Sequence, residues 1–164
     1  MNNIDIRLLE ITSELGAGTR GASLGVGALK VVAFNEKSDF FSRYNTIEIK
    51  NFNEFLFAKN KTPRAIRIEH IEKEFKEIAK SVENAFMDDK FPFLMSGDHS
   101  TAASTIAGIQ KSFPNQRLGV IWVDAHADLH SPYTSPSGNV HGMPLAIACG
   151  LDNKAKQVAE VNED

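Results

Sequence analysis

An alternation of strand-like and helix-like segments constrains the fold of this chain more than any other feature. Phe91 to Met95 and Leu118 to Val123 are apolar runs of strand length, and Thr101 to Phe113 between them carries apolar residues on one helical side. The second run is nearly continuous, which is typical of a strand buried on both faces. Strands that alternate with helices predict an α/β fold with a mostly parallel sheet.

The rest of the chain continues this alternation. We expect strands at residues 4–11 and 46–49 and a helix at residues 24–34. A longer helix is predicted to begin at Thr62-Pro63, because threonine can cap free amides and proline suits the first helical position. Its apolar residues recur at spacings of three and four and predict one buried face: Ile68, Ile71, Phe75, Ile78, Ala79, Val82 and Phe86.

Composition places the chain among ordinary globular proteins. It has 164 residues, 42% of them hydrophobic and 24% charged, which suits one compact domain. The net charge is −3 and the lysines and arginines are scattered, unlike the basic stripe of a nucleic-acid-binding protein. The start MNNIDIRLLE does not resemble a signal peptide, and no apolar stretch approaches the ~20 residues of a membrane span. We therefore expect a cytoplasmic protein with no nucleic-acid or membrane partner.

Two residues of types that often carry chemistry are expected to be structural here. Cys149 is the only cysteine, which excludes an intrachain disulfide framework and a thiolate metal cluster. It ends the apolar run Leu145 to Cys149, so we expect a buried small hydrophobe. His70 lies off the apolar face of its helix and is expected to be solvated rather than a ligand.

Asp124-Ala125-His126-Ala127-Asp128 places three metal-type ligands at alternate positions, directly after the apolar run that ends at Val123. Extended backbone sends alternate residues to one face, but four rises of ~3.3 Å span ~13 Å, too far for metals ~3.5–4 Å apart. We therefore expect the strand to end near Asp124 and the chain to curl around the site. Ionised groups directly after a buried strand are costly unless paired or metal-bound, which favours a metal site over a solvated loop.

Two further segments contribute imidazoles. His99 in Gly97-Asp98-His99-Ser100 follows the first apolar strand, so it should lie at the carboxyl edge of the sheet, where ligands bind in open α/β folds. Oxygen and imidazole ligands without sulfur suit manganese, iron, cobalt or zinc. His141 in Ser137-Gly138-Asn139-Val140-His141-Gly142 is as readily structural as functional, although an imidazole beside a metal can shuttle protons near neutral pH.

Gly16-Ala17-Gly18-Thr19-Arg20-Gly21 fits the GxGxxG pattern of dinucleotide-binding loops, with Glu36 and Asp39 near the expected acidic position. The strand before it is weak, because it carries the charged residues Arg7, Glu10 and Glu14. We therefore favour a flexible loop over a nucleotide site.

Taken together, GDHS at 97–100, DAHAD at 124–128 and SGNVHG at 137–142 resemble the ureohydrolase family of arginases, agmatinases and formiminoglutamases. The segment GAGTRGASLGVGALK also resembles the family's opening loop and helix, so the likeness covers essentially the whole chain. The resemblance implies an arginase-like three-layer α/β sandwich with a mostly parallel sheet. It also implies two Mn²⁺ ions per complete active site, a small-molecule guanidino substrate, and a homo-oligomer (trimer or hexamer) when complete.

The resemblance assigns roles at the metal centre. His99 and Asp128 would bind one metal, His126 would bind the other, and Asp124 would bridge them. The metals would activate a bridging hydroxide, oriented by Asp128, that attacks the guanidinium carbon. His141 resembles the histidine that shuttles protons to the departing product.

The resemblance also bears on the substrate. Ser137 and Asn139 resemble the arginase residues that hold the α-carboxylate of the amino acid, a group that agmatine lacks. Hydrolysis of L-arginine to L-ornithine and urea is therefore the expected reaction. His130 stands where many arginases have an asparagine in a substrate-contacting loop, which leaves strict arginine specificity open. An agmatinase, or another guanidino- or formimino-amino-acid hydrolase, is the alternative.

Family members are about twice the length of this chain, and their second half brings an SxDxDxxDP-type strand whose aspartates complete the metal ligands. Nothing after Leu151 supplies such a strand, because LDNKAKQVAEVNED is a charged tail. We therefore expect residues 1–164 to be the N-terminal half of a single ureohydrolase domain, with a truncated fold and no activity on its own. A non-catalytic remnant is the other possibility.

Overall fold

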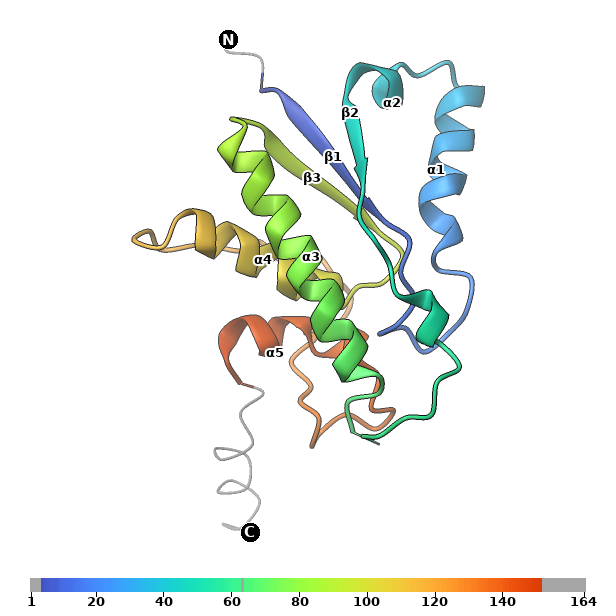
Figure 1. Ribbon diagram of the computed structural model, residues 1–164, viewed down its shortest axis with the longest axis vertical. Coiled ribbons are helices and arrows are strands. Elements are labelled where there is room, and N and C mark those ends of the chain that lie inside the picture. Colours follow the sequence, from blue (N-terminus) through green and yellow to red (C-terminus); the bar gives the residue numbers. More distant parts are fainter. Residues whose placement is uncertain (1–3, 63, 152–164) are drawn as a thin grey trace.

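The computed structural model describes residues 4–62 and 64–151 as a sheet with helices packed against it (Figure 1). In chain order the helices are α1 (Leu24–Asn35), α2 (Phe40–Arg43), α3 (Ile68–Met87), α4 (Thr101–Ser112) and α5 (Pro144–Cys149), with short 3-10 helices η1 (Asn53–Phe55) and η2 (Val140–Gly142). The predicted helices at 24–34 and 101–113 are confirmed to within one residue at each end.

The sheet is parallel throughout and has three strands. β1 (Ile6–Ile11) lies between β2 (Asn45–Glu48) and β3 (Phe91–Ser96). Ile11 pairs with Ser96 at the last position of the ladder, so the chain leaves β1 and β3 at the same edge. The predicted parallel sheet and these three strands are confirmed, and the carboxyl edge is where His99 follows β3.

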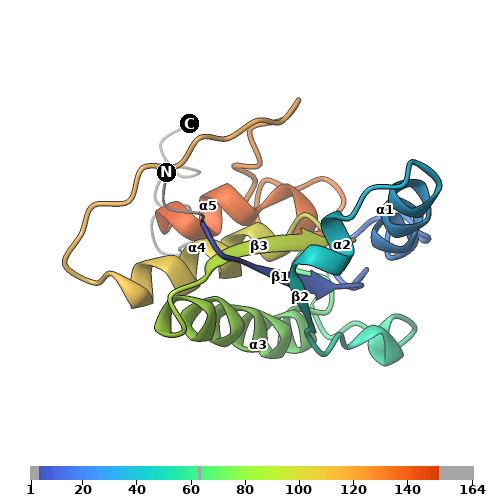
Figure 2. The same ribbon diagram turned by 90° about the horizontal axis from the view of Figure 1, so that it is seen from above.

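Both faces of the sheet are covered because successive side chains of β1 point to opposite sides. Leu8 packs with Val26 of α1 and Met95 of β3, whereas Leu9 packs with Ile78 and Val82 of α3. Figure 2 shows the strands between α3 on one side and α1 and α2 on the other. These layers confirm the expected three-layer α/β arrangement.

The segment Leu118 to Val123 is not a strand, contrary to the prediction. It is irregular, and Ile121 and Val123 are 92% and 93% exposed. A cavity of about 560 Å³ separates it from β3 and α4, lined in part by Leu94, Ile106 and Trp122. The described sheet ends at β3, so no strand among residues 4–62 and 64–151 pairs with this backbone. Apolar composition alone does not form a strand without a hydrogen-bonding partner.

The α3 helix begins later than expected, at Ile68 instead of Thr62-Pro63. Arg67 adopts a left-handed conformation with φ of 60°, which interrupts any helix that approaches from its amino side. The Thr62 hydroxyl donates to the Ala65 carbonyl and caps no amide of α3, while Pro63 lies outside the described residues. The apolar face itself forms as predicted, with Ile71, Ile78, Ala79 and Val82 buried.

Two local environments also differ from the predictions. His70 is half-buried rather than solvated, because its ring stacks on Phe55 with 3.8 Å between centroids. Cys149 is exposed rather than buried. It is the last residue of the short helix α5, which buries only Pro144 and Ala146.

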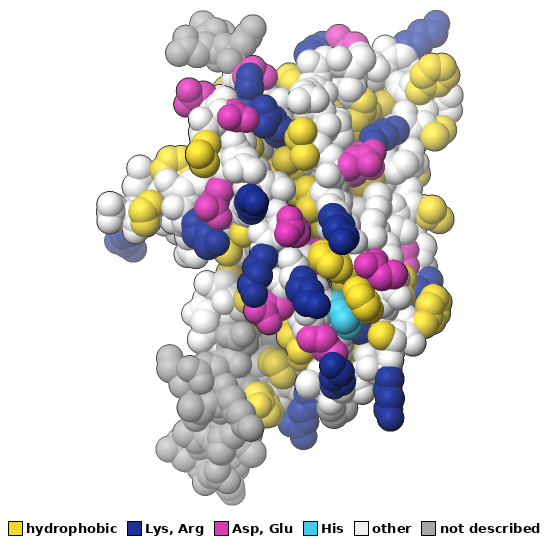
Figure 3. Space-filling model, in the orientation of Figure 1, with side chains coloured by type: hydrophobic (Ala, Val, Ile, Leu, Met, Phe, Trp, Pro, Cys, Tyr) yellow, Lys and Arg dark blue, Asp and Glu magenta, His cyan; other side chains and the backbone are white. Residues whose placement is uncertain are grey.

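The surface over α3 carries acidic and basic side chains in alternation rather than a patch of one sign (Figure 3). Ion pairs such as Lys76–Glu72 hold opposite charges one helical turn apart. No helix in the part of the chain that the structure describes has the length and apolar character to cross a membrane.

Glu74 on α3 makes the stability of the fold depend on pH. Its side chain is fully buried, and this burial raises the pKa of Glu74 to about 7. The folded chain therefore keeps this proton to a higher pH than the unfolded chain does. As the pH rises from about 4.5 to about 7, the free energy of unfolding should fall by about 3 kcal/mol.

Glu74→Gln should remove this fall, because glutamine stays neutral. Urea unfolding between pH 4.5 and 8 measures the effect. The matched control is Glu77→Gln, at an exposed position on the same helix, which should keep the parent's pH profile. Identical profiles for Glu74→Gln and the parent would contradict the prediction.

Candidate metal centre

The turn after β3 places His99 at the carboxyl edge of the sheet. Gly97 is required there, because a side chain would meet backbone atoms of Ser13, Ala22 and Ser23 at 2.8–2.9 Å. The buried Asp98 carboxylate accepts hydrogen bonds from the Gly16 and Ser100 amides, which fixes the turn. Burial raises the pKa of Asp98, and the two amides oppose this shift.

Three predicted ligands converge beyond this turn. The His99 Nε2 atom lies 3.0 Å from Asp128 Oδ2 and 3.4 Å from Asp124 Oδ2. One ligand atom from each of the three residues lies within 4.8 Å of the others. An imidazole and two carboxylates at these separations could share one cation.

The second oxygen of Asp124 faces His126. Asp124 Oδ1 accepts from the His126 amide at 2.7 Å and lies 3.3 Å from His126 Nδ1. The amide hydrogen bond is the main cause that lowers the pKa of Asp124, with the charge of His99 acting in the same direction. Asp124 therefore touches one imidazole with each of its oxygens, although the ring of His126 is largely exposed.

Asp128 is the most firmly held of the three. Its side chain is only 6% exposed, and Trp122 Nε1 donates to Oδ2 at 3.2 Å. Its backbone adopts the left-handed conformation, with φ of 50°, and its carbonyl accepts from the amides of Leu145 and Ala146 in α5. The chain thus curls around the site after Asp124, as expected, and α5 anchors the curl.

A neighbouring cavity of about 500 Å³ connects the metal-type ligands with two other predicted site residues. It is lined by His126, Asp128, His130 and His141, among others. Ser137 and Asn139 do not line it. The Ser137 hydroxyl accepts from the Asn139 amide at 3.2 Å in the turn before η2.

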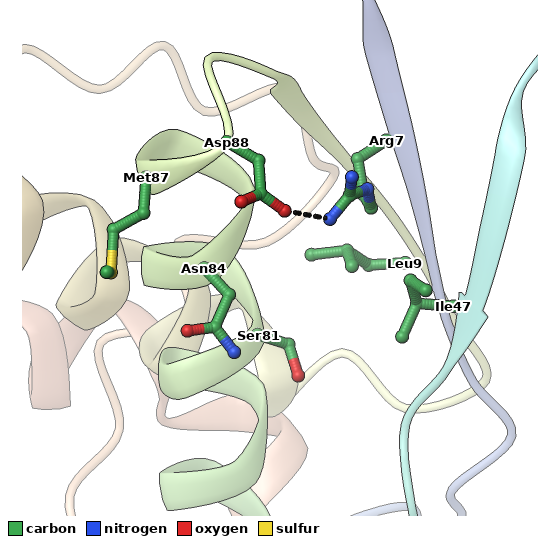
Figure 4. A pocket seen from close by; sticks show the side chains of 7 residues that line it. All are labelled: Arg7, Leu9, Ile47, Ser81, Asn84, Met87 and Asp88. Atoms are coloured by element: carbon green, nitrogen blue, oxygen red, sulfur yellow. Dashed lines mark hydrogen bonds and ion pairs between the residues drawn. The ribbon is translucent and has the colours of Figure 1, made fainter.

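A separate cavity of about 250 Å³ lies between β1, β2 and α3 (Figure 4). Its one cationic group, Arg7, already pairs with Asp88 at 2.8 Å. The cavity therefore offers no unpaired charged side chain and no cluster of acid and base groups. We do not infer a second site there.

The donor set fits a hard or borderline divalent cation. All candidate ligand atoms are oxygen or imidazole nitrogen, which suits manganese, iron, cobalt or zinc. Within residues 4–62 and 64–151, this is the one group of at least three such side chains close enough to share an ion.

The family of this chain follows from its similarity to known proteins. The arginase family model matches residues 4–160. The arginase of Bacillus subtilis (strain 168) is 34% identical over 92% of this chain and 50% of its own length. The chain belongs to the arginase family.

Solved arginase structures agree with this assignment. The arginase of Bacillus caldovelox superposes with a TM-score of 0.72 at 29% identity, over 87% of this chain and 48% of that one. The Entamoeba histolytica arginase in complex with L-ornithine gives a TM-score of 0.76 at 28% identity, over 89% and 50%. The chain thus spans about half the length of the arginases it matches.

Sequence reasoning missed several residues that shape this candidate site. Trp122 was counted only as part of an apolar strand, yet it holds Asp128. The Gly16–Gly21 loop was expected to be flexible, but Arg67 Nε donates to the Leu15 carbonyl at 2.7 Å and His141 bonds to Gly16. Glu14 also anchors the loop, because it accepts from the Gly21 and Ser23 amides. The three glycines of the GxGxxG pattern were the available signal, because glycines at fixed spacing indicate close backbone approach as well as flexibility.

Proposed function

We propose that this chain supplies the His99–Asp124–Asp128 part of a two-manganese centre in a ureohydrolase that converts L-arginine to L-ornithine and urea. The observation that carries the proposal is the convergence of these three donors, within 4.8 Å, at the carboxyl edge of an arginase-family sheet. When bound, the metal ions would supply Lewis acidity and lower the pKa of water, so that hydroxide is available near neutral pH.

We assign His99 and Asp128 to one metal, His126 to the other, and Asp124 to both. The geometry of Asp124 supports this division, because its two oxygens face different imidazoles at 3.4 and 3.3 Å. Asp128 would also orient the nucleophile, and its hydrogen bond from Trp122 leaves that carboxylate little freedom.

The substrate's guanidinium group would occupy the cavity beside the centre. His141 lines that cavity and would pass a proton to the departing amine. His130 also lines it and would contact the substrate. Ser137 and Asn139 would hold the α-carboxylate of the amino acid. The relative crystallised with L-ornithine supports an amino-acid product.

We further propose that carboxylates outside residues 4–151 complete the two-metal centre, from the same polypeptide or from a second one. The described residues bring only three donors to one point, whereas two ions need more. We call the chain together with these ligands the completed enzyme. We expect it to be a cytoplasmic trimer or hexamer.

Urea release by the completed enzyme tests the reaction. With saturating manganese, arginine should be hydrolysed faster than agmatine or a guanidino acid. Asn139→Ala should raise the KM for arginine by about 10-fold or more, because hydrogen bonds to charged groups contribute about 1.5–3 kcal/mol. The KM for agmatine, which has no carboxylate, should change little.

Other outcomes would assign a different function. A preference for agmatine, unaffected by Asn139→Ala, would favour an agmatinase. Failure to release urea from any of the three substrates would favour a non-catalytic remnant.

A further inference from the structure

The Asp98 carboxylate does more than shape the turn that carries His99. It is 1% exposed and accepts the amide hydrogen of Gly16, a residue 82 positions away. Its other oxygen accepts the Ser100 amide at 3.0 Å. Asp98 thus clamps the loop after β1 to the loop after β3.

The carbonyl of the same Gly16 residue holds His141. It accepts from the His141 backbone amide at 3.1 Å and lies 3.0 Å from His141 Nδ1. A carbonyl oxygen can only accept a hydrogen bond, so Nδ1 must carry the proton. In the neutral ring Nε2 is then the basic nitrogen, the atom that gains and loses the exchangeable proton.

Close packing requires glycine at the centre of this arrangement. A Cβ atom on Gly16 would lie 2.7 Å from Asp98 Oδ2 and 2.6 Å from Ser100 Oγ. A Cβ atom on Gly18 would lie 3.1 Å from the Asn139 side-chain nitrogen and 3.5 Å from His141 Cε1. The Gly16-Ala17-Gly18 part of the GxGxxG pattern therefore allows the close approach of His141 and Asn139.

We propose that Asp98 is a positioning residue for His141. Through the Gly16 residue it fixes the imidazole in the tautomer protonated on Nδ1 and leaves Nε2 for proton transfer in the cavity. This orientation and tautomer of the His141 ring follow from the contacts of residues 16, 98 and 141 alone. Their effect on turnover rests on the proposed function, in which His141 protonates the leaving amine.

The placement is tested without any reaction, by NMR of the 164-residue chain labelled with ¹⁵N in its histidines and free of metal. Long-range ¹H–¹⁵N correlations report which ring nitrogen carries the proton. His141 should be the Nδ1–H tautomer. In Asp98→Asn it should shift toward a mixture of tautomers. Gly16 and Ser100 donate to different oxygens of Asp98, and the variant would present an NH2 donor in place of one of them.

Two controls isolate the effect. Glu14→Gln alters another carboxylate that anchors the same loop, at Gly21 and Ser23 instead of Gly16, and should leave the His141 tautomer unchanged. The His70 signals report whether each variant keeps its fold, since this ring stacks on Phe55. An Nε2–H or averaged His141 ring in the parent chain would overturn the proposal. So would an Asp98→Asn variant with unchanged His141 signals.

Kinetics of the completed enzyme separate this inference from the proposed function. At saturating manganese, Asp98→Asn should lower kcat about 10–100-fold, as loss of outer supporting contacts commonly does, with a smaller change in KM. A shifted tautomer with unchanged kcat would leave the placement intact and would contradict the role of His141 in the reaction. An unshifted tautomer would overturn the placement, whatever the kinetics.

Discussion

Asp128→Ala is expected to lower kcat of the completed enzyme by more than His141→Ala, whose loss should stay within the ~10²–10⁴-fold typical of general acid–base help. Asp128 contributes in two ways. It is the buried ligand of the cluster, 3.0 Å from His99 Nε2, and its carboxylate would orient the nucleophile. Its removal leaves Asp124 as the one carboxylate that pairs with His99 within the described residues.

The measurement is kcat at saturating manganese, with the bound metal counted in each variant. Asp128→Asn is the matched control, because an amide oxygen can still accept from Trp122 while the charge is lost. It should keep the fold of the loop and lose most of the activity. Equal losses for Asp128→Ala and His141→Ala would mean that the two roles are wrongly assigned.

The second large effect concerns residues 1–164 expressed alone, which should release no appreciable urea from arginine. The described residues gather one imidazole and two carboxylates, with His126 beside them, and metal affinity depends on ligand number and geometry. We therefore expect weak manganese binding and no turnover. A urea assay with saturating manganese measures this, and real turnover by these residues would show that they suffice.

The open edge of the sheet is a second reason to expect residues 1–164 to be inactive alone, because it favours association between copies of the chain. β3 is an edge strand with Phe91 and Phe93 at least 41% exposed, and Ile121 and Val123 are also exposed across the adjacent cavity. Open edges with apolar side chains favour association between chains. Sedimentation of residues 1–164 should therefore show self-association that increases with concentration.

Local signals predicted most of the fold. The segments predicted as strands at 4–11 and 91–95 form strands, because each packs apolar side chains against helices. The residues spaced three and four apart in α3 form its buried face. The run Leu118 to Val123 is more uniformly apolar than residues 4–11 but forms no strand, because a strand needs a hydrogen-bonding partner, which composition does not reveal. The predicted start of α3 was wrong because Arg67 adopts a left-handed backbone conformation, which has no sequence signature.

For the candidate site, the sequence predicted the ligands but not the contacts that support them. The spacing of DAHAD and its position after an apolar run predict Asp124, His126 and Asp128 as metal ligands from the sequence alone. The supporting contacts could not be predicted, because they join residues far apart in the chain. Gly16 meets Asp98 across 82 positions, and no periodicity records such a pair.

The central claim is that His99, Asp124 and Asp128 bind a metal ion at the carboxyl edge of this sheet. Substoichiometric Mn²⁺ added to the uniformly ¹⁵N-labelled chain tests it directly, because the paramagnetic ion broadens the signals of nearby nuclei. The account predicts that His99, His126 and Asp128 broaden first and that Asp124→Ala abolishes the effect. Asp5 and Asp88 at the opposite edge of the sheet should stay sharp. Broadening spread evenly over exposed carboxylates, or unchanged in Asp124→Ala, would contradict it.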